Sequence, residues 1–266
     1  FSPAMEFLSL KDLLETKYQQ YHNNGFIDKD PISVPHRYSR KQDIEIVAFI
    51  TATISWGNRT SIIKNADALF SKMGSSPYDF VLNHGQRDLK TLDNWVHRTF
   101  QTADLLGFIH FLQRHYQNFD SLEEAFVGNQ PFRSVADSLT FLSDYMFSAN
   151  ETILERTRKH VGNPQRGSAC KRLNMFLRWM VRPGDGGVDF GLWKKIPLKS
   201  LMMPLDVHVD RVARSLGMLQ RKQSDWKSVE ELTTFCRLLD AEDPVKYDYA
   251  LFGMSIKQKK ISPVIL

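Results

Sequence analysis

Cysteine is scarce in this sequence, with Cys170 and Cys236 the two present among 266 residues. They are far apart, so the chain lacks both the CxxC spacing of a zinc site and the four cysteines that hold an iron-sulfur cluster. Two cysteines suit a reducing compartment, although they leave room for one disulfide. We therefore expect a cytoplasmic protein with no cofactor, no metal and no iron-sulfur cluster.

Long apolar runs are also missing, and none approaches the roughly 18 residues that a membrane-spanning helix requires. The opening residues, Phe1-Ser2-Pro3-Ala4, lack the basic start and apolar stretch of a signal peptide, and Met5 is a candidate native start. Thirty-five Lys and Arg oppose 30 Asp and Glu, a net charge of +5. This excess permits a polyanionic partner without requiring one, and we expect no membrane association.

Strand-like alternation is scarce as well, whereas helix signals recur along the chain. Three serines precede an acidic residue by the spacing of a capping box: Ser9 with Asp12, Ser121 with Glu124, and Ser134 with Asp137. Apolar spacing predicts helices at 88–98, 103–116, 122–127 and 134–148. The sequence therefore predicts an all-α fold.

Residues 44–56, IEIVAFITATISW, are apolar on nearly every side. As a helix this segment would lie at the centre of a bundle, although a buried strand has the same pattern. The next residues favour the helix, because Asn58 suits an N-cap and apolar residues then recur at helical spacing. We expect two helices joined by the loop SWGN, and a candidate domain boundary in the glycine-rich loop 182–191.

The segment from Gly167 to Arg182 is predicted to be a helix with one apolar face. Its other side carries a polar and basic stripe: Lys171, Asn174, Arg178 and Arg182. Such a stripe could meet phosphates, but most basic stripes are solvated helix faces, and that alternative stays open. Lys171 lies in the first turn, where it opposes the positive end of the helix dipole, and this can lower its pKa. An amine nucleophile needs such a lowered pKa.

Asp206 comes directly before a second amphipathic helix, VHVDRVARSL, which Gly217 would end. Asp is among the best N-cap residues, and a cap that contributes on the order of 1 kcal/mol would explain it. A metal site formed by Asp206, His208 and Asp210 would need an extended strand. On a helix, Asp210 instead pairs with Arg214. The helical pattern favours the cap.

The string PLDVHVDRVARSLGML, residues 204–219, resembles the catalytic-aspartate segment of the helix-hairpin-helix DNA glycosylase superfamily, which includes endonuclease III and the 8-oxoguanine glycosylases. The resemblance implies that Asp206 is the catalytic aspartate, and His208, Arg211 and Val212 match the rest of that pattern.

A second likeness lies upstream, where Lys171 corresponds to the lysine that attacks the sugar in lyase-competent members. Thirty-five residues separate Lys171 from Asp206, and residues 182–200 resemble the insertion of the archaeal 8-oxoguanine glycosylase branch.

Weaker likeness extends over residues 41–256. The segment from Phe49 to Phe70 resembles the start of the six-helix barrel of that superfamily, and DPVKYDYALFGMSI resembles its closing helix. The strings are also similar to an uncharacterised bacterial family assigned to the superfamily. The resemblance implies a six-helix barrel domain at 41–182, ending in the helix-hairpin-helix. It also implies a second helical domain, formed by 1–40 and 183–266, that carries the aspartate.

The function implied is that of a monomeric DNA N-glycosylase of base-excision repair, with AP-lyase activity, that removes a damaged base from double-stranded DNA; 8-oxoguanine is favoured. Residues expected to contact DNA come from the hairpin, the basic stripe and the aspartate segment: Gly162, Gly167, Ser168, Asn174, Arg178, Arg182, His208 and Arg211.

Trp56 and Asn58 of the SWGN loop would fill the gap left by a flipped base, although a Trp56 that only packs the barrel is an equal alternative. Two other hypotheses stay open for the whole chain. One is a catalytically inactive helix-hairpin-helix protein that binds DNA, and the other is a helical scaffold that binds protein.

Overall fold

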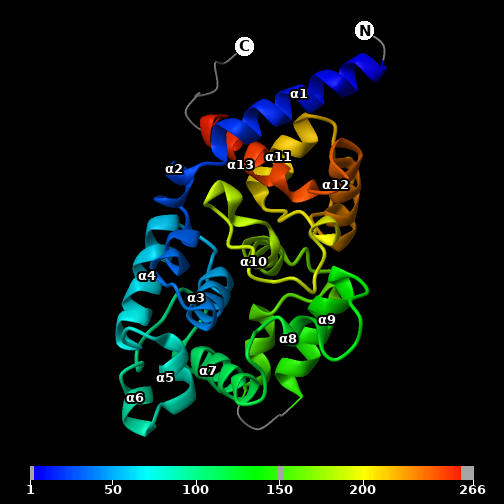
Figure 1. Cartoon of the computed structure of the whole chain (residues 1–266). Helices are drawn as coiled ribbons and strands as arrows, with labels where there is room; N and C mark the ends of the chain where they lie inside the picture. Colours follow the sequence, from blue (N-terminus) through cyan, green and yellow to red (C-terminus); the bar gives the residue numbers. More distant parts are fainter. Residues whose placement is uncertain (1–2, 149–152, 259–266) are drawn as a thin grey trace.

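The computed structural model of the chain describes residues 3–148 and 153–258, and this part contains helices and no strand (Figure 1). The α-helices are α1 (Pro3–Tyr21), α2 (Asn24–Ile27), α3 (Lys41–Thr53), α4 (Arg59–Lys72), α5 (Pro77–Asn83), α6 (Gln86–Lys90), α7 (Thr102–Tyr116), α8 (Glu124–Val127), α9 (Val135–Phe147), α10 (Lys171–Val181), α11 (Val207–Ser215), α12 (Trp226–Leu239) and α13 (Tyr247–Gln258). Short 3₁₀ helices lie between them: η1 (Pro31–Ser33), η2 (Pro35–Arg37), η3 (Glu155–His160), η4 (Pro164–Arg166), η5 (Gly184–Gly186), η6 (Leu198–Ser200) and η7 (Pro244–Lys246). The predicted all-α class is confirmed. None of the described helices is long and apolar enough to cross a membrane.

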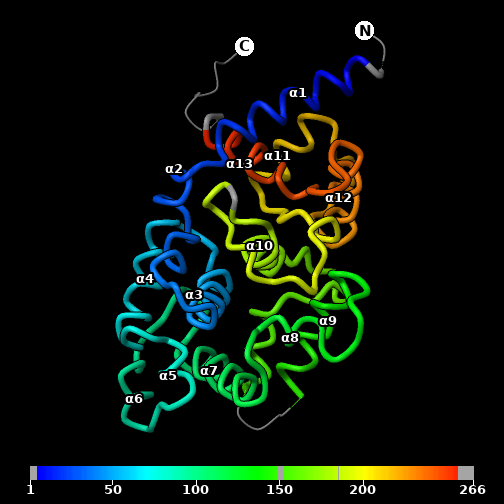
Figure 2. Tube along the Cα trace, viewed as in Figure 1, coloured from blue at the N-terminus to red at the C-terminus, as the bar shows by residue number. Residues whose placement is uncertain are grey.

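The helices form two groups with α10 between them. In Figure 1, α3 to α9 make up the lower part, while α1, α11, α12 and α13 make up the upper part. α1 packs along α13, which also packs against α11, so segments from opposite ends of the chain lie side by side (Figure 2). α10 packs against α3, and one cluster of buried apolar side chains runs through both groups. The division into domains at residue 182 stays a prediction.

α3 is the central helix of the lower group, and its side chains from Asp43 to Thr53 are all buried. The helix prediction for this segment is confirmed, and the alternative of a buried strand is wrong. A buried carboxylate must recover the hydrogen bonds that it loses from water. Glu45 of α3 does so by accepting bonds from the Tyr116 hydroxyl at 2.8 Å and the Trp193 indole N–H at 2.7 Å.

Two of the predicted helix starts are confirmed by their cap hydrogen bonds. The Asn58 side chain accepts the backbone N–H of Ser61 at 3.2 Å and begins α4. The Ser134 hydroxyl accepts the N–H of Asp137 at 3.1 Å and begins α9. α7, α8 and α9 lie within or overlap the predicted ranges 103–116, 122–127 and 134–148.

Two predicted capping boxes are wrong. Ser9 lies inside α1, which begins at Pro3, so it caps nothing. The Ser121 hydroxyl donates to Glu45 at 2.6 Å and accepts the N–H of Glu123 at 3.2 Å, rather than pairing with Glu124. The spacing of a capping box does not decide either case, because α1 begins before Ser9 and the hydroxyl of Ser121 bonds to the buried Glu45 carboxylate.

The helix predicted at 88–98 is wrong over most of its length, because α6 ends at Lys90. Asn94 and Arg98, in the turns that follow, have φ angles of 63° and 55°. A residue in the left-handed region cannot continue a right-handed helix. Elsewhere, Cys170 and Cys236 are both buried and free, so the disulfide left open by the sequence does not form.

Candidate active site

A tight turn leads directly into α10. Gly167 has a φ of 77°, a value that glycine adopts without strain. A Cβ at Gly162 would lie 3.1 Å from both the Cys170 sulfur and the Ser168 hydroxyl oxygen, so the two arms approach more closely than a side chain allows. The Ser168 hydroxyl accepts the Cys170 N–H at 3.1 Å. The three predicted hairpin residues thus share one turn, although the arm before it consists of η3 and η4 rather than an α-helix.

Lys171 is the first residue of α10, and its side chain is half-buried. Its amine lies 3.6 Å from the sulfur of Met175, a weak acceptor. Among the described residues, no carboxylate oxygen lies within 4.0 Å of this amine. Burial lowers the pKa of Lys171, against the opposing charges of Asp206 and Asp248. The amine is therefore shifted toward its neutral, nucleophilic form.

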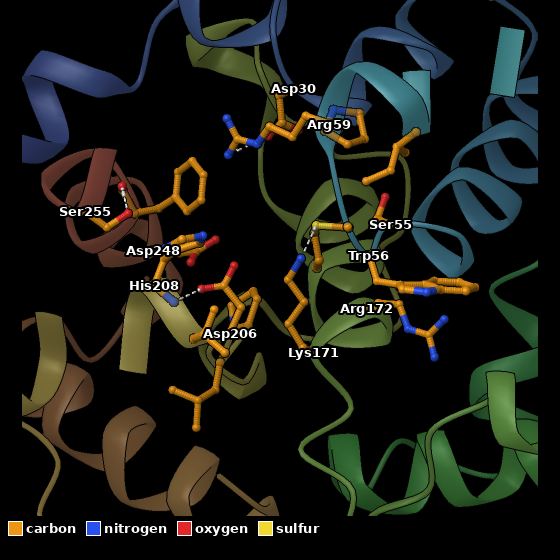
Figure 3. Close-up of a pocket in the computed structure, with 18 of the residues that line it drawn as sticks. Asp30, Ser55, Trp56, Arg59, Lys171, Arg172, Asp206, His208, Asp248 and Ser255 are labelled. Atoms are coloured by element: carbon orange, nitrogen blue, oxygen red, sulfur yellow. Dashed lines mark hydrogen bonds and ion pairs between the residues drawn. The ribbon is translucent and has the colours of Figure 1, made fainter. Parts of the chain in front are cut away.

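Asp206 is the N-cap of α11, as predicted. Its Oδ1 accepts the backbone N–H groups of His208 at 2.8 Å and of Val209 at 2.9 Å. Both cap bonds use the same oxygen, and Oδ2 accepts no hydrogen bond from the described residues. Figure 3 shows the carboxylate on the side of the site that faces Lys171. The cap bonds hold the carboxylate in place and leave one oxygen available.

Lys171 and Asp206 line the same cavity, which has a volume of about 760 Å³ (Figure 3). Segments that are distant in sequence form its walls: residues 26–31, the SWGN loop with the start of α4, residues 171–178 of α10, residues 204–208, Ser224, and α13. The volume lies within the range of small-ligand pockets, about 300 to 1,000 Å³. The fold therefore brings the two predicted catalytic residues into one site.

Asp248 also lines this cavity, and the sequence interpretation missed it. It is buried on α13 and forms an ion pair with Arg178. Burial raises the pKa of Asp248 to about 6, although the Arg178 guanidinium opposes the shift. A signal was present in the sequence, because an acidic residue inside the apolar string YDYALFG must be buried together with a partner.

Arg59 is a second residue that the sequence interpretation missed. Its guanidinium lies 4.2 Å from the ring centroid of Phe252, and its Nη2 lies 3.8 Å from Oδ2 of Asp30. Because Arg59 belongs to α4 and Phe252 to α13, this contact joins opposite walls of the cavity. Its positive charge contributes to the lowered pKa of Lys171.

The role of Trp56 in filling a gap in DNA stays a prediction, and the side chain is half-buried in the lining of the cavity. Its ring stacks on His160 with centroids 5.8 Å apart and meets His97 edge-on at 5.1 Å, with the Arg172 guanidinium 4.8 Å away. In Figure 3 the indole points away from Lys171. The alternative in which Trp56 packs the barrel describes this arrangement. Asn58 is exposed at the cavity, and its side chain caps α4.

Apart from Lys171, the residues of the predicted basic stripe are not on the surface. Asn174, Arg178 and Arg182 are 1%, 3% and 3% exposed. The alternative of a solvated face is therefore wrong, and so are contacts of Asn174 and Arg182 with the DNA backbone at the surface. Arg178 is buried but lines the cavity, so its contact with DNA stays a prediction. Residues 182–200 cover this side of α10, with the N–H of Phe190 bonded to the Trp179 carbonyl at 2.8 Å.

The buried arginines belong to an internal ion-pair network. Arg178 lies 3.3 Å from a carboxylate oxygen of Asp189 and also pairs with Asp248. Arg182 lies 3.3 Å from the other Asp189 oxygen and 2.9 Å from Asp243. Since unpaired buried charges cost several kcal/mol each, these carboxylates are what allow α10 to be buried on its polar side.

The other predicted DNA contacts lie on α11. His208 is half-buried in the cavity lining, with its ring centroid 6.3 Å from that of Phe252, and Arg211 is exposed. Asp210 pairs with Arg214 at 2.8 and 2.9 Å, as predicted for a helix. Because this segment is helical, the extended arrangement that a metal site would need is not formed.

Together these features define an all-α protein in which an amine and a carboxylate line one cavity. The family model described as "Protein of unknown function (DUF2400)" matches residues 30–257, and the chain belongs to this family. Lys171, Asp206 and Asp248 all lie within the matched range. The expectation of an uncharacterised family is confirmed. No curated protein and no solved structure matches the chain.

Proposed function

We propose that this protein is a DNA N-glycosylase with AP-lyase activity that acts in base-excision repair on double-stranded DNA containing a damaged base. One observation carries the proposal: the Lys171 amine, with a lowered pKa and no carboxylate within 4.0 Å among the described residues, shares a cavity with the Asp206 carboxylate. The resemblance of the Asp206 segment to the helix-hairpin-helix glycosylases supports the same chemistry.

The reaction begins when the neutral Lys171 amine attacks C1′ of a nucleotide flipped into the cavity. A bond forms from Nζ to C1′ while the bond from C1′ to the base breaks, and the base leaves with the electron pair and takes up a proton. Lys171 then loses a proton, the C1′–O4′ bond breaks with O4′ taking the electron pair and a proton, and a Schiff base forms between Nζ and C1′. Removal of a C2′ proton then breaks the C3′–O bond and cleaves the strand.

Asp206 serves the steps in which positive charge develops on the sugar. Its Oδ2, which accepts no hydrogen bond from the described residues, is available to stabilise that charge and to assist proton transfer. Oδ1 is held by two backbone N–H groups, so the carboxylate is positioned before the substrate arrives. Cap and catalyst are therefore compatible roles for one side chain.

The hairpin from Gly162 to Ser168 would bind a phosphate of the DNA strand through its backbone N–H groups and the N-terminus of α10. The base favoured is 8-oxoguanine, because the separation of 35 residues between Lys171 and Asp206 resembles the archaeal 8-oxoguanine glycosylases. A cavity of about 760 Å³ has room for a base with its sugar.

Borohydride trapping on duplexes that carry an abasic site or 8-oxoguanine tests the proposal. The wild-type protein should form a covalent adduct with DNA, because borohydride reduces a Schiff base to a stable amine. Lys171→Ala should abolish the adduct, whereas the matched variant Lys90→Ala, on an exposed lysine of α6, should retain it.

The absence of a wild-type adduct on both duplexes would remove the lyase activity. An undiminished adduct in Lys171→Ala would exclude Lys171 as the nucleophile. Salt-dependent binding of duplex DNA without any adduct would instead favour the catalytically inactive DNA-binding protein, and no DNA binding at all would favour the protein scaffold.

A further inference from the structure

A second cavity, of about 560 Å³, lies between the start of α9 and α12 and is separate from the one that holds Lys171. Three cationic side chains line it: Arg133, Lys199 and Arg237. Glu230 is the acidic residue in the lining, and its Oε1 accepts the indole N–H of Trp226 at 3.1 Å. Cationic residues are therefore in excess over acidic ones in this cavity.

None of the three cations has a carboxylate oxygen within 4.0 Å among the residues that the structure describes. Arg133 and Lys199 are exposed. Arg237 donates to three backbone carbonyls, those of Lys199 at 3.3 Å, Ser200 at 3.4 Å and Leu201 at 3.5 Å, and to the sulfur of Met202 at 3.6 Å. These acceptors are neutral and leave the charge of the guanidinium uncompensated. Unpaired cations that line a concave surface attract anions, and a guanidinium suits the oxygens of a phosphate.

The walls of this second cavity also hold the hairpin turn. The backbone N–H of Trp226, at the start of α12, donates to the Gly167 carbonyl at 3.4 Å. The Thr140 hydroxyl of α9 lies 3.5 Å from Oδ1 of Asn163. Ser134, at the cavity end of α9, is six residues from Thr140, or about 9 Å along a helix. About three phosphates of one strand cover that distance along the axis of a duplex.

We infer that the second cavity binds a phosphate of the DNA strand that the hairpin holds, and so extends the DNA-binding surface from the hairpin across α9 and α12. The cavity offers positive charge without carboxylate partners, and its walls position both the cations and the hairpin. This inference rests on the DNA partner of the proposed function but not on its chemistry.

The double variant R133A/K199A tests the inference, because both side chains are exposed and their removal leaves the core unchanged. Arg237 is retained, since it donates to the backbone carbonyls of residues 199 to 201. The control is R87A/K90A on α6, which lies on another side of the lower group in Figure 1. Binding to a duplex with a tetrahydrofuran abasic-site analogue is measured by fluorescence anisotropy over a series of salt concentrations.

In a plot of log affinity against log salt, we expect the slope of R133A/K199A to be shallower by about 0.9 for each phosphate that the variant no longer neutralises. The R87A/K90A slope should equal that of the wild type. The borohydride adduct at saturating protein should not change in either variant, because Lys171 lies in the other cavity. A slope in R133A/K199A that equals the control would overturn the inference and leave the proposed chemistry standing.

The proposed chemistry can also fail while the phosphate site stands. If the wild type forms no adduct but the slope of R133A/K199A is still shallower, the chemistry fails and the phosphate site stands. Binding of inorganic phosphate is measured in a separate titration, in which the melting temperature of the protein is monitored. Stabilisation by phosphate that is absent in R133A/K199A, together with an unchanged DNA slope, would assign the site to a free phosphate and overturn the DNA assignment.

Discussion

The two ends of α10 carry cations on the same side of one helix but differ in their surroundings. Lys171, in the first turn, faces the cavity and has no carboxylate within 4.0 Å among the described residues. Arg178 and Arg182, in and after the last turn, are buried and paired with acidic residues, of which Asp189 serves both. The helical spacing in the sequence places these cations on one face and does not distinguish them. Their surroundings differ because different distant segments of the chain pack against each end of α10.

The difference shows two ways in which a protein accommodates a cation that is partly or fully removed from water. At the C-terminal end, carboxylates supply the opposite charge, so Arg178 and Arg182 stay charged and serve stability. At the N-terminal end, burial lowers the pKa of Lys171, so the amine more readily loses its charge. The first arrangement stabilises the charged guanidinium groups, whereas the second favours the neutral form of the amine, which the proposed reaction needs.

Replacing Arg182 with Met should give the largest effect on stability. The change removes the cation that pairs with half-buried Asp243 and leaves buried Asp189 paired with Arg178 alone, and breaking a buried ion pair by removing one partner costs about 3–5 kcal/mol. Urea unfolding measures the decrease. The matched change Lys171→Met removes a half-buried cation that has no carboxylate partner, and it should leave the free energy of unfolding nearly unchanged. Equal decreases in the two variants would contradict the distinction between the ends of α10.

Asp206→Asn separates the cap from the chemistry. Asn is as good an N-cap as Asp, so the free energy of unfolding and DNA affinity should change little. In the proposed reaction this change removes the charge that would stabilise the sugar, so single-turnover base excision should slow by on the order of 10²-fold. Asp206→Ala, which lacks the cap too, should be about 1 kcal/mol less stable than Asp206→Asn. Unchanged excision in Asp206→Asn would restrict Asp206 to a structural role.

The pH dependence of adduct formation tests whether nearby carboxylates raise the pKa of Lys171. Of the three predictions, this one has the smallest expected effect. The rate should increase with pH through the pKa of Lys171, which lies below the usual 10.5, because only the neutral amine attacks. Asp248 is charged above a pKa of about 6 and raises the pKa of Lys171. Asp248→Asn should therefore shift the rate profile to lower pH. A shift to higher pH would show that Asp248 does not favour the charged amine.

Local patterns in the sequence predicted several features well. The uniform apolar character of residues 44–56 indicated the central helix, and Asn58, Ser134 and Asp206 proved to be N-caps, because a cap depends on a side chain and backbone a few residues apart. The left-handed turns at Asn94 and Arg98 ended a predicted helix early. Asn is one of the few residues besides glycine that adopt this conformation readily, but no local spacing reveals such a turn at an arginine.

The sequence by itself determined the all-α class, the helix start at Asp206 and the choice of Lys171 and Asp206 as a pair worth testing. Only the tertiary structure decided that both line one cavity, that Asp248 joins them, and that Arg178 and Arg182 lie inside. The physical reason is the range of the forces. Capping and amphipathic spacing act within one or two helical turns, whereas burial and charge compensation depend on chain segments such as 182–200, whose position no local pattern specifies.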